Sequence, residues 1–333
     1  MGYDEDPFEG LTGDRTASDK YDDQRDAAFR QLVKRSGGPS GFYASMFADD
    51  LGRLVPYDSG LKRPYSVRLA PSDPRVEEII LNSLPEDYGP SRTLEDGLRV
   101  FAEHCVNDLF RGRVTVDVEP YRDPQGVARA FRVHPIAADF ITRYRGRPIR
   151  YVPSGLSPPV HGGFHYVEVD PSTLVEIDLE RAQRSVLTRA LRALAAADRQ
   201  QFVPTSMLAL GDGATGFRVK DHQSMVSAWV RAETRELGWD ARGLITDGML
   251  DPYRVWRSIQ FARFQVGVRD TVLVGFQQVL DVAGRMLGFT VRMEVEGLLA
   301  ASELDEAETQ LKEGTRSLSE LSRLALMMPP RTD

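Results

Sequence analysis

The stretch Met293–Arg323 constrains the fold of this chain more than any other part, because it carries the start and stop signals of two successive helices. After a short expected strand, Ser302 is the predicted N-cap of the first helix, and three acidic residues in the following turn suit the positive end of its dipole. Gly314 is the predicted stop of that helix. Ser317 and Glu320 then have capping-box spacing, so the stretch predicts a helix, a glycine turn and a second helix.

This arrangement resembles the C-terminal region of tailed-bacteriophage portal proteins, the head-to-tail connectors of phage capsids. In that family an apolar and acidic strand leads through a loop to a helix, and a Gly-x-x-Thr-x-Asn-Glu-x-Arg turn starts the last helix. The chain has similar residues at those places, with the arginine one position late: Gly314, Ser317, Ser319, Glu320 and Arg323. The resemblance implies a short variant of the family.

The resemblance also implies a structural, non-enzymatic role. The subunits would form a homo-oligomeric ring, usually a dodecamer, at one capsid vertex, and double-stranded DNA would pass through its centre during packaging and ejection. The implied partners are the terminase large subunit, the major capsid protein and a head-completion adaptor protein, with transient, sequence-independent contact to DNA. The implied location is the virion, assembled in the host cytoplasm.

The bulk composition sets the expected class of protein. A chain of 333 residues with 41% hydrophobic and 27% charged residues is long enough for one large or two ordinary domains of a folded, soluble protein. No apolar run reaches the roughly 18 residues of a transmembrane helix, and the acidic start does not resemble a signal peptide, so we expect no membrane association. The single cysteine, Cys105, excludes an intrachain disulfide and a cysteine-based metal cluster.

The net charge of −7 is concentrated at the two ends of the chain. Residues 1–26 hold nine acidic and three basic side chains, and residues 294–333 hold nine acidic and four basic ones, so the middle is slightly positive. An overall basic nucleic-acid binder is therefore not expected. We expect residues 1–26 to form an acidic flexible arm, either a dispensable tail or a tether to a neighbouring subunit.

The apolar spacing predicts an α+β fold. A period of 3.6 predicts helices at 22–35, 76–83, 93–111, 179–201, 223–237 and 253–287. The last of these segments is either one long helix or two abutting helices. A period of two predicts strands at 114–118, 128–133, 142–152, 164–169 and within 202–220.

This order is also similar to the parts of a portal subunit. The resemblance implies an α/β wing, long stem helices, a small β-containing clip between them, and C-terminal helices near the wing and crown. The corresponding segments would be an arm 1–26, a wing-like region 27–178, a first stem helix 179–201, a clip 202–250, long stem or wing helices 251–292 and a C-terminal part 293–333. The position of the second stem helix stays open.

The polar side of the predicted helix 179–201 is the main candidate for a functional surface. It carries five arginines at helical spacing: Arg181, Arg184, Arg189, Arg192 and Arg199. Such a row can line a DNA channel or face a neighbouring subunit, because guanidinium groups bind phosphates and carboxylates. A solvated side balanced by the nearby Glu176, Glu180 and Asp198 explains the same pattern and is the commoner situation.

Motifs for enzymatic chemistry are weak. Residues 211–216, Gly-Asp-Gly-Ala-Thr-Gly, match the dinucleotide fingerprint, but residues 217–220 read as a strand where the fingerprint needs a helix, so a hairpin turn is the better interpretation. No P-loop motif and no Gly-x-Ser-x-Gly elbow is present. His161 and His165 lie in a stretch rich in glycine and proline, which does not suit a helical zinc motif.

Cys105 lies on the apolar stripe of the predicted helix 93–111, so we expect a buried, inert thiol. A Cys–His pair would need a histidine such as His134 brought close by folding. No catalytic residue, cofactor or metal ligand is therefore predicted. Two alternatives to the portal hypothesis remain: a soluble α+β enzyme whose site is assembled from scattered polar residues, and another ring-forming virion component.

Overall fold

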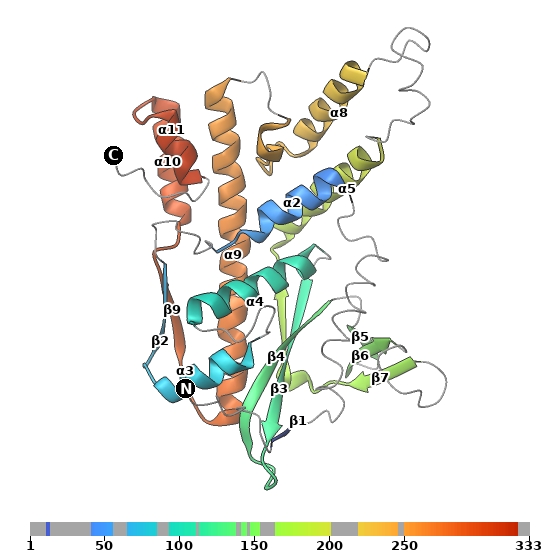
Figure 1. Ribbon diagram of the computed structural model, residues 1–333, viewed down its shortest axis with the longest axis vertical. Helices are drawn as coiled ribbons and strands as arrows, with labels where there is room; N and C mark the ends of the chain where they lie inside the picture. The colour runs from blue at the N-terminus through green and yellow to red at the C-terminus, as the bar shows by residue number, and fades with distance from the viewer. Residues whose placement is uncertain are drawn as a thin grey trace, which may run out of the picture. The chain divides into compact units, whose positions relative to one another are not determined.

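The computed structural model combines helices with small antiparallel sheets, which confirms the α+β class (Figure 1). It describes residues 11–13, 41–55, 65–84, 93–110, 113–137, 141–144, 147–153, 164–200, 219–245 and 250–325. The chain divides into two compact units, each assembled from separate stretches of sequence. Unit 1 comprises 1–38, 65–179 and 269–298, and unit 2 comprises 39–64, 180–268 and 299–333.

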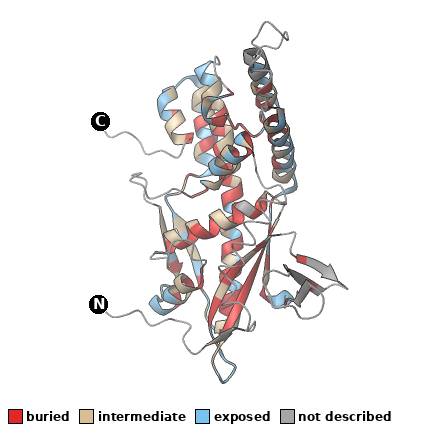
Figure 2. Cartoon of the chain, turned by 45° about the vertical axis from the view of Figure 1, so that its right-hand side comes forward, coloured by how far each residue is buried: buried red, intermediate tan, exposed pale blue. Residues whose placement is uncertain are grey.

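The central sheet of unit 1 is built on a hairpin of β3 (Arg113–Arg122) and β4 (Ala128–Ala137). The other edge of β3 pairs with β8 (Leu174–Asp178) and, farther along, with β1 (Thr12–Gly13). All of these pairs are antiparallel. The strand β3 is buried along most of its length, as Figure 2 shows, so it forms the centre of this unit.

Helices cover one face of this sheet. The helix α4 (Leu94–Leu109) contacts both strands of the hairpin, and its Phe101 ring lies 4.8 Å from the ring of Phe276 on α9 (Asp251–Leu287). A Cβ atom added to Gly275 of α9 would lie 2.3 Å from the side chain of Ile177 on β8. The glycine therefore permits a close approach of helix to strand that any other residue would obstruct.

The remaining elements of unit 1 are one helix and two small sheets. The helix α3 (Pro74–Ser83) contacts β4 and begins at Asp73, whose carboxylate accepts hydrogen bonds from the next turn. One small sheet pairs β2 (Ser66–Ala70) with β9 (Arg292–Glu296) in antiparallel orientation. The other is antiparallel as well and has the order β5 (Ile141–Tyr144), β6 (Arg147–Pro153) and β7 (Phe164–Glu168).

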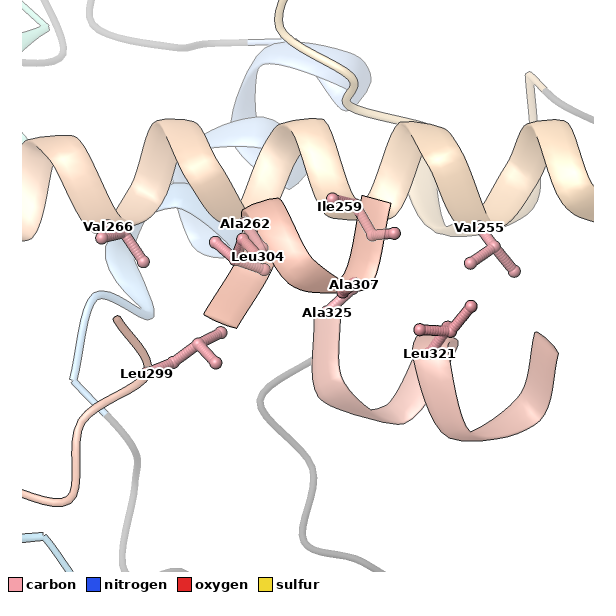
Figure 3. Close-up of a cluster of buried hydrophobic side chains, with 9 residues drawn as sticks. All are labelled: Val255, Ile259, Ala262, Val266, Leu299, Leu304, Ala307, Leu321 and Ala325. Carbon is pink, nitrogen blue, oxygen red and sulfur yellow. The ribbon is translucent and has the colours of Figure 1, made fainter. Parts of the chain in front are cut away.

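Unit 2 is helical in its described part. It holds the first half of α9 together with α2 (Phe42–Gly52), α5 (Arg181–Gln200), α8 (Val219–Glu233), α10 (Ala301–Glu313) and α11 (Leu318–Ala325). Within this unit α10 and α11 lie on one side of α9, and α2, α5 and α8 lie on the other (Figure 1). An apolar cluster joins α10 and α11 to α9 (Figure 3): Val255, Ile259, Ala262, Val266, Leu299, Leu304, Ala307, Leu321 and Ala325.

Most of the predicted elements are confirmed, and the long apolar segment is the single helix α9. Gly314, with a φ of 68°, ends α10 as predicted. Ser317 and Glu320 bond each other's backbone N–H groups at 3.3 and 3.4 Å, so the predicted capping box starts α11. The helix expected at 22–35 lies outside the described residues.

The predicted N-cap of α10 is wrong. The helix begins at Ala301 rather than after Ser302, because Glu303 reaches back and accepts a hydrogen bond of 2.8 Å from the N–H of Ala300. The carboxylate at the third position supplies one half of a capping box, and the N-cap residue, an alanine, has no side-chain acceptor for the other half.

The strand prediction within 202–220 is wrong for its last residues, because Val219 and Lys220 already belong to α8. This helix buries Val226 and Val230, which lie one turn apart. The helix predicted at 223–237 is α8, which begins four residues earlier than expected, within the segment 202–250. The glycine motif at 211–216 lies outside the described residues. A helix, not a strand, starts three residues after it, so the reason given for reading it as a hairpin turn no longer holds.

The sequence-based segments also differ from the two units. Residues 39–64, assigned to the wing-like region, belong to unit 2, and the segment 251–292 is divided between the units after residue 268. Within the expected arm, Thr12 and Gly13 pair with β3 of the same chain. The elements α2, β2 and β8 were not predicted.

Candidate functional site: the arginine face of α5

The helix α5 has one buried and one exposed face. The side chains at three- and four-residue spacing that pack inward are Leu187, Ala190, Ala193, Leu194 and Ala197. Three of these five are alanines, so α5 packs closely against α2 and α8 within unit 2. The opposite face is free to carry long charged side chains.

Three of the five predicted arginines form a line along that exposed face. Arg181, Arg192 and Arg199 are all exposed. Arg192 follows Arg181 by about three helical turns, and Arg199 follows Arg192 by about two turns. The three guanidinium groups therefore project from the same side of α5, over roughly 27 Å of its length. None of the three forms an ion pair with a carboxylate in the described part of the chain.

The other two arginines are less available. Arg189 pairs with Glu236, just beyond the end of α8, where Nη1 lies 3.3 Å from Oε1. Arg184 is half-buried. The predicted set of five thus separates into a line of three unpaired cations, one paired cation and one that is partly covered. We call Arg181, Arg192 and Arg199 the arginine line.

Two of the three acidic residues expected to balance the arginines have other partners, and the third, Glu180, is exposed and forms no ion pair among the described residues. Glu176 belongs to β8 in unit 1, where its carboxylate lies 4.0 Å from Arg113. Asp198 points away from the arginine line and accepts hydrogen bonds from the backbone of α2. The exposed face of α5 therefore retains its positive charge, and it can donate charge-assisted hydrogen bonds to carboxylates or phosphates.

A second charged face lies on α10, the helix whose acidic first turn was noted in the sequence. Glu306 and Glu313 are exposed and lie opposite the buried Leu304 and Ala307. Glu306 accepts a hydrogen bond of 2.8 Å from the neutral amide of Gln310. Neither carboxylate forms an ion pair with a basic side chain among the described residues.

The carboxylates on the flank of α10 are used to hold the helix in place. Arg263 of α9 donates to Asp305 and to Glu308, both at 2.8 Å, and Lys312 lies 2.9 Å from Glu308. The hydrogen bond from Lys312, followed by that from Arg263, lowers the pKa of Glu308 to about 2. This network fixes the face that carries Glu306 and Glu313.

A buried polar cluster on the central sheet was also missed. On β3, Asp117 accepts a hydrogen bond of 3.0 Å from the hydroxyl of Thr173, and Glu119 lies 3.0 Å from Nε2 of His134 on β4. All four side chains are buried. Because each polar group has a partner from another strand or turn, the cluster is suited to fixing strand register.

Cys105 is fully buried, as predicted, and burial, with a smaller effect of Asp108, raises the pKa of its thiol well above the ordinary value. A protonated, inaccessible thiol is a poor nucleophile. His134, the histidine that might have joined it, instead pairs with Glu119. His161 lies outside the described residues, and His165 lies on β7.

In the described part of the chain, no group of three or more histidine, cysteine, aspartate or glutamate side chains is placed to hold a metal ion. No helix of that part is long and apolar enough to span a membrane. No known protein family matches this sequence, and no curated protein does so.

Proposed function

We propose that this chain is a structural subunit of a ring, the portal at one vertex of a tailed-phage capsid, through which double-stranded DNA is packaged and ejected. The observation that carries the proposal is a helix pair in unit 2. The helices α5 and α8 contact each other and run in opposite directions (Figure 1), which agrees with the pairing of Arg189 on α5 with Glu236 after α8. Residues 201–218 connect them.

This pair corresponds to the two stem helices with a small insertion between them that the resemblance implies. In the proposal, α5 is the first stem helix and α8 is the second, which the sequence analysis left open. On this assignment α8 no longer belongs to the clip expected at 202–250. Antiparallel helices held by small side chains form a rigid wall, which suits a channel that must keep its bore during DNA transit.

The C-terminal part supports the same proposal. The strand β9, the helix α10, the glycine stop at Gly314 and the capped helix α11 follow in the order on which the resemblance rests. The apolar cluster packs α10 and α11 onto α9, so these two helices belong to the framework of unit 2 and are not a loose appendage.

The proposed role requires no catalytic centre. A ring forms when one face of a subunit binds a different face of the next and the rotation between them closes. The proposed partners are further copies of this chain, the terminase large subunit, the major capsid protein and a head-completion adaptor. DNA would be contacted only transiently, since tight phosphate binding would resist sliding. The proposed location is the virion.

Purified full-length chain tests the proposal. Native mass spectrometry and negative-stain electron microscopy should show closed rings of about twelve copies, with an axial opening wide enough for a DNA duplex. Ring number can vary in a recombinant preparation, so the closed ring with an open axis is the decisive feature. A chain that stays monomeric at high protein concentration would contradict the proposal.

A further inference from the structure

Two faces of opposite charge lie on opposite sides of unit 2. The helix α5 carries five arginines and one aspartate, and α10 carries five carboxylates and one lysine. Within the unit, α10 lies on one side of α9 and α5 on the other (Figure 1). One molecule therefore cannot bring the two faces together, whereas neighbouring molecules in a head-to-tail arrangement can.

The charges on the two faces that form no ion pair among the described residues have the same spacing. Arg192 and Arg199 are seven residues apart on the exposed side of α5, and Glu306 and Glu313 are seven residues apart on the exposed side of α10. Seven residues are close to two helical turns, so each pair projects from one side of its helix with about 10 Å between its members. Two helices laid side by side could form both ion pairs at once.

We propose that the arginine line of α5 docks against the Glu306–Glu313 face of α10 from a second copy of this chain, forming the contact between adjacent subunits of the ring. The proposal rests on the ring function proposed above and names the surfaces that build it. Such a contact joins two different faces, as a cyclic ring with more than two members requires. The charges set the register and suppress wrong pairings, and other contacts add to the affinity.

Charge complementarity favours a second copy over DNA as the occupant of the arginine line. Among the described residues, α10 carries two carboxylates outside ion pairs, Glu306 and Glu313, and two members of the arginine line, Arg192 and Arg199, have the same spacing. If the arginines bound only DNA phosphates, they would not be available to Glu306 and Glu313 of a neighbouring copy, and DNA itself would offer these carboxylates no cation. Contact between copies satisfies both faces with groups that the chain itself provides.

A charge-swap experiment on the full chain tests the proposal. The variant Arg192→Glu/Arg199→Glu has two acidic faces, and the variant Glu306→Arg/Glu313→Arg has two basic faces. Each alone should lose the ring species in native mass spectrometry, because like charges then meet at every contact. The two variants mixed in equal amounts should form rings of alternating subunits, and the quadruple variant should recover rings by itself.

The matched control reverses two exposed arginines of unit 1, Arg75→Glu and Arg285→Glu, and should leave the rings intact. Circular dichroism and thermal unfolding of every variant separate loss of assembly from loss of folding, and recovery on mixing cannot come from an unfolded chain. If the wild type forms rings and both double variants form them as well, the docking proposal is overturned while the ring function stands. A wild-type chain that forms no ring overturns both.

Discussion

The carboxylate of Asp198 on α5 accepts a hydrogen bond of 2.8 Å from the backbone N–H of Tyr43, 155 positions earlier in the chain. The same carboxylate accepts a second bond of 3.0 Å from the N–H of Ala44. These N–H groups open α2, whose own N-cap residue, Gly41, has no side chain to offer them. One helix of unit 2 thus caps another, and a negative group lies at the positive end of the α2 dipole.

Replacing Gly41 with alanine should destabilise unit 2. An added Cβ would lie 2.1 Å from the carboxyl carbon of Asp198, so either the cap or the packing of α2 on α5 must shift. We expect the free energy of unfolding to fall by about 1–3 kcal/mol, the usual cost of overpacking. Denaturant titration measures it, with Gly52→Ala as the control. A Cβ at Gly52 meets nothing within 4 Å, so that variant should be neutral or more stable.

Removing the Asp198 cap of α2 should lower the free energy of unfolding by less than a large cavity in the apolar core would. Asp198→Ala leaves the N–H groups of Tyr43 and Ala44 without their acceptor, and the expected loss is about 0.5–2 kcal/mol. Asp198→Asn keeps an acceptor oxygen but not the charge, so it should retain part of this stability. Chemical denaturation of the two variants side by side gives the comparison. Equal stability of wild type, alanine and asparagine would show that the cap contributes nothing.

These contacts show where sequence reasoning succeeds and where it stops. The cap of α11 lies within a few residues of the helix it serves, and the spacing of Ser317 and Glu320 was enough to predict it. Asp198 was expected to balance the arginines beside it, because its distant partner on α2 leaves no local signal. The helix α2 was missed for the same reason, since its cap comes from another part of the chain.

The strands β2 and β8 were missed, and each pairs with a strand far away in sequence, which local spacing does not show. The arginines of α5 were found from their helical spacing alone. Which of them are unpaired follows only from the folded positions of Glu236, Glu176 and Asp198. The acidic face of α10 was read as a helix-dipole feature, and its place on the opposite side of unit 2 could not be derived from spacing.

Arg257 on α9 is fully buried and holds the backbone of the segment after α8. Its guanidinium donates to the carbonyls of Arg231, Thr234 and Trp239 and to the Thr234 hydroxyl. Trp239 directly precedes a left-handed turn in which Ala241 and Arg242 have φ values of 52° and 55°. Burial lowers the pKa of Arg257, and its donors are directed mainly to carbonyl oxygens.

Arg257→Met should therefore lower the free energy of unfolding by about 3 kcal/mol, because it leaves several buried carbonyls without donors. The control is Arg254→Met, one turn earlier, whose side chain is 42% exposed and lies 3.9 Å from Asp251. A surface pair of that kind contributes less than about 1 kcal/mol. Denaturation followed by tryptophan fluorescence measures the effect, with signal from the buried Trp239 and from Trp229 and Trp256. Equal effects of the two substitutions would refute a special role for Arg257.

Glu308 ties α10 to α9 through Arg263, and its bonds to Lys312 and Arg263 lower its pKa to about 2. A carboxylate whose folded pKa is lowered stabilises the fold above its unfolded pKa, near 4.5, and loses that contribution as the pH falls toward 2. Glu308→Gln should therefore be less stable than wild type at pH 7, by about 0.5–1 kcal/mol after solvent screening.

The difference between wild type and Glu308→Gln should shrink as the pH falls from about 4.5 toward 2, because wild-type Glu308 then becomes neutral like the glutamine. Unfolding curves collected at pH 7, 5, 4 and 3 measure this difference, and general acid destabilisation cancels between the two proteins. Glu78→Gln, at an exposed position of α3, should show no such trend. A Glu308→Gln difference that stays constant over this range would show that the network stabilises α10 by packing and not by charge.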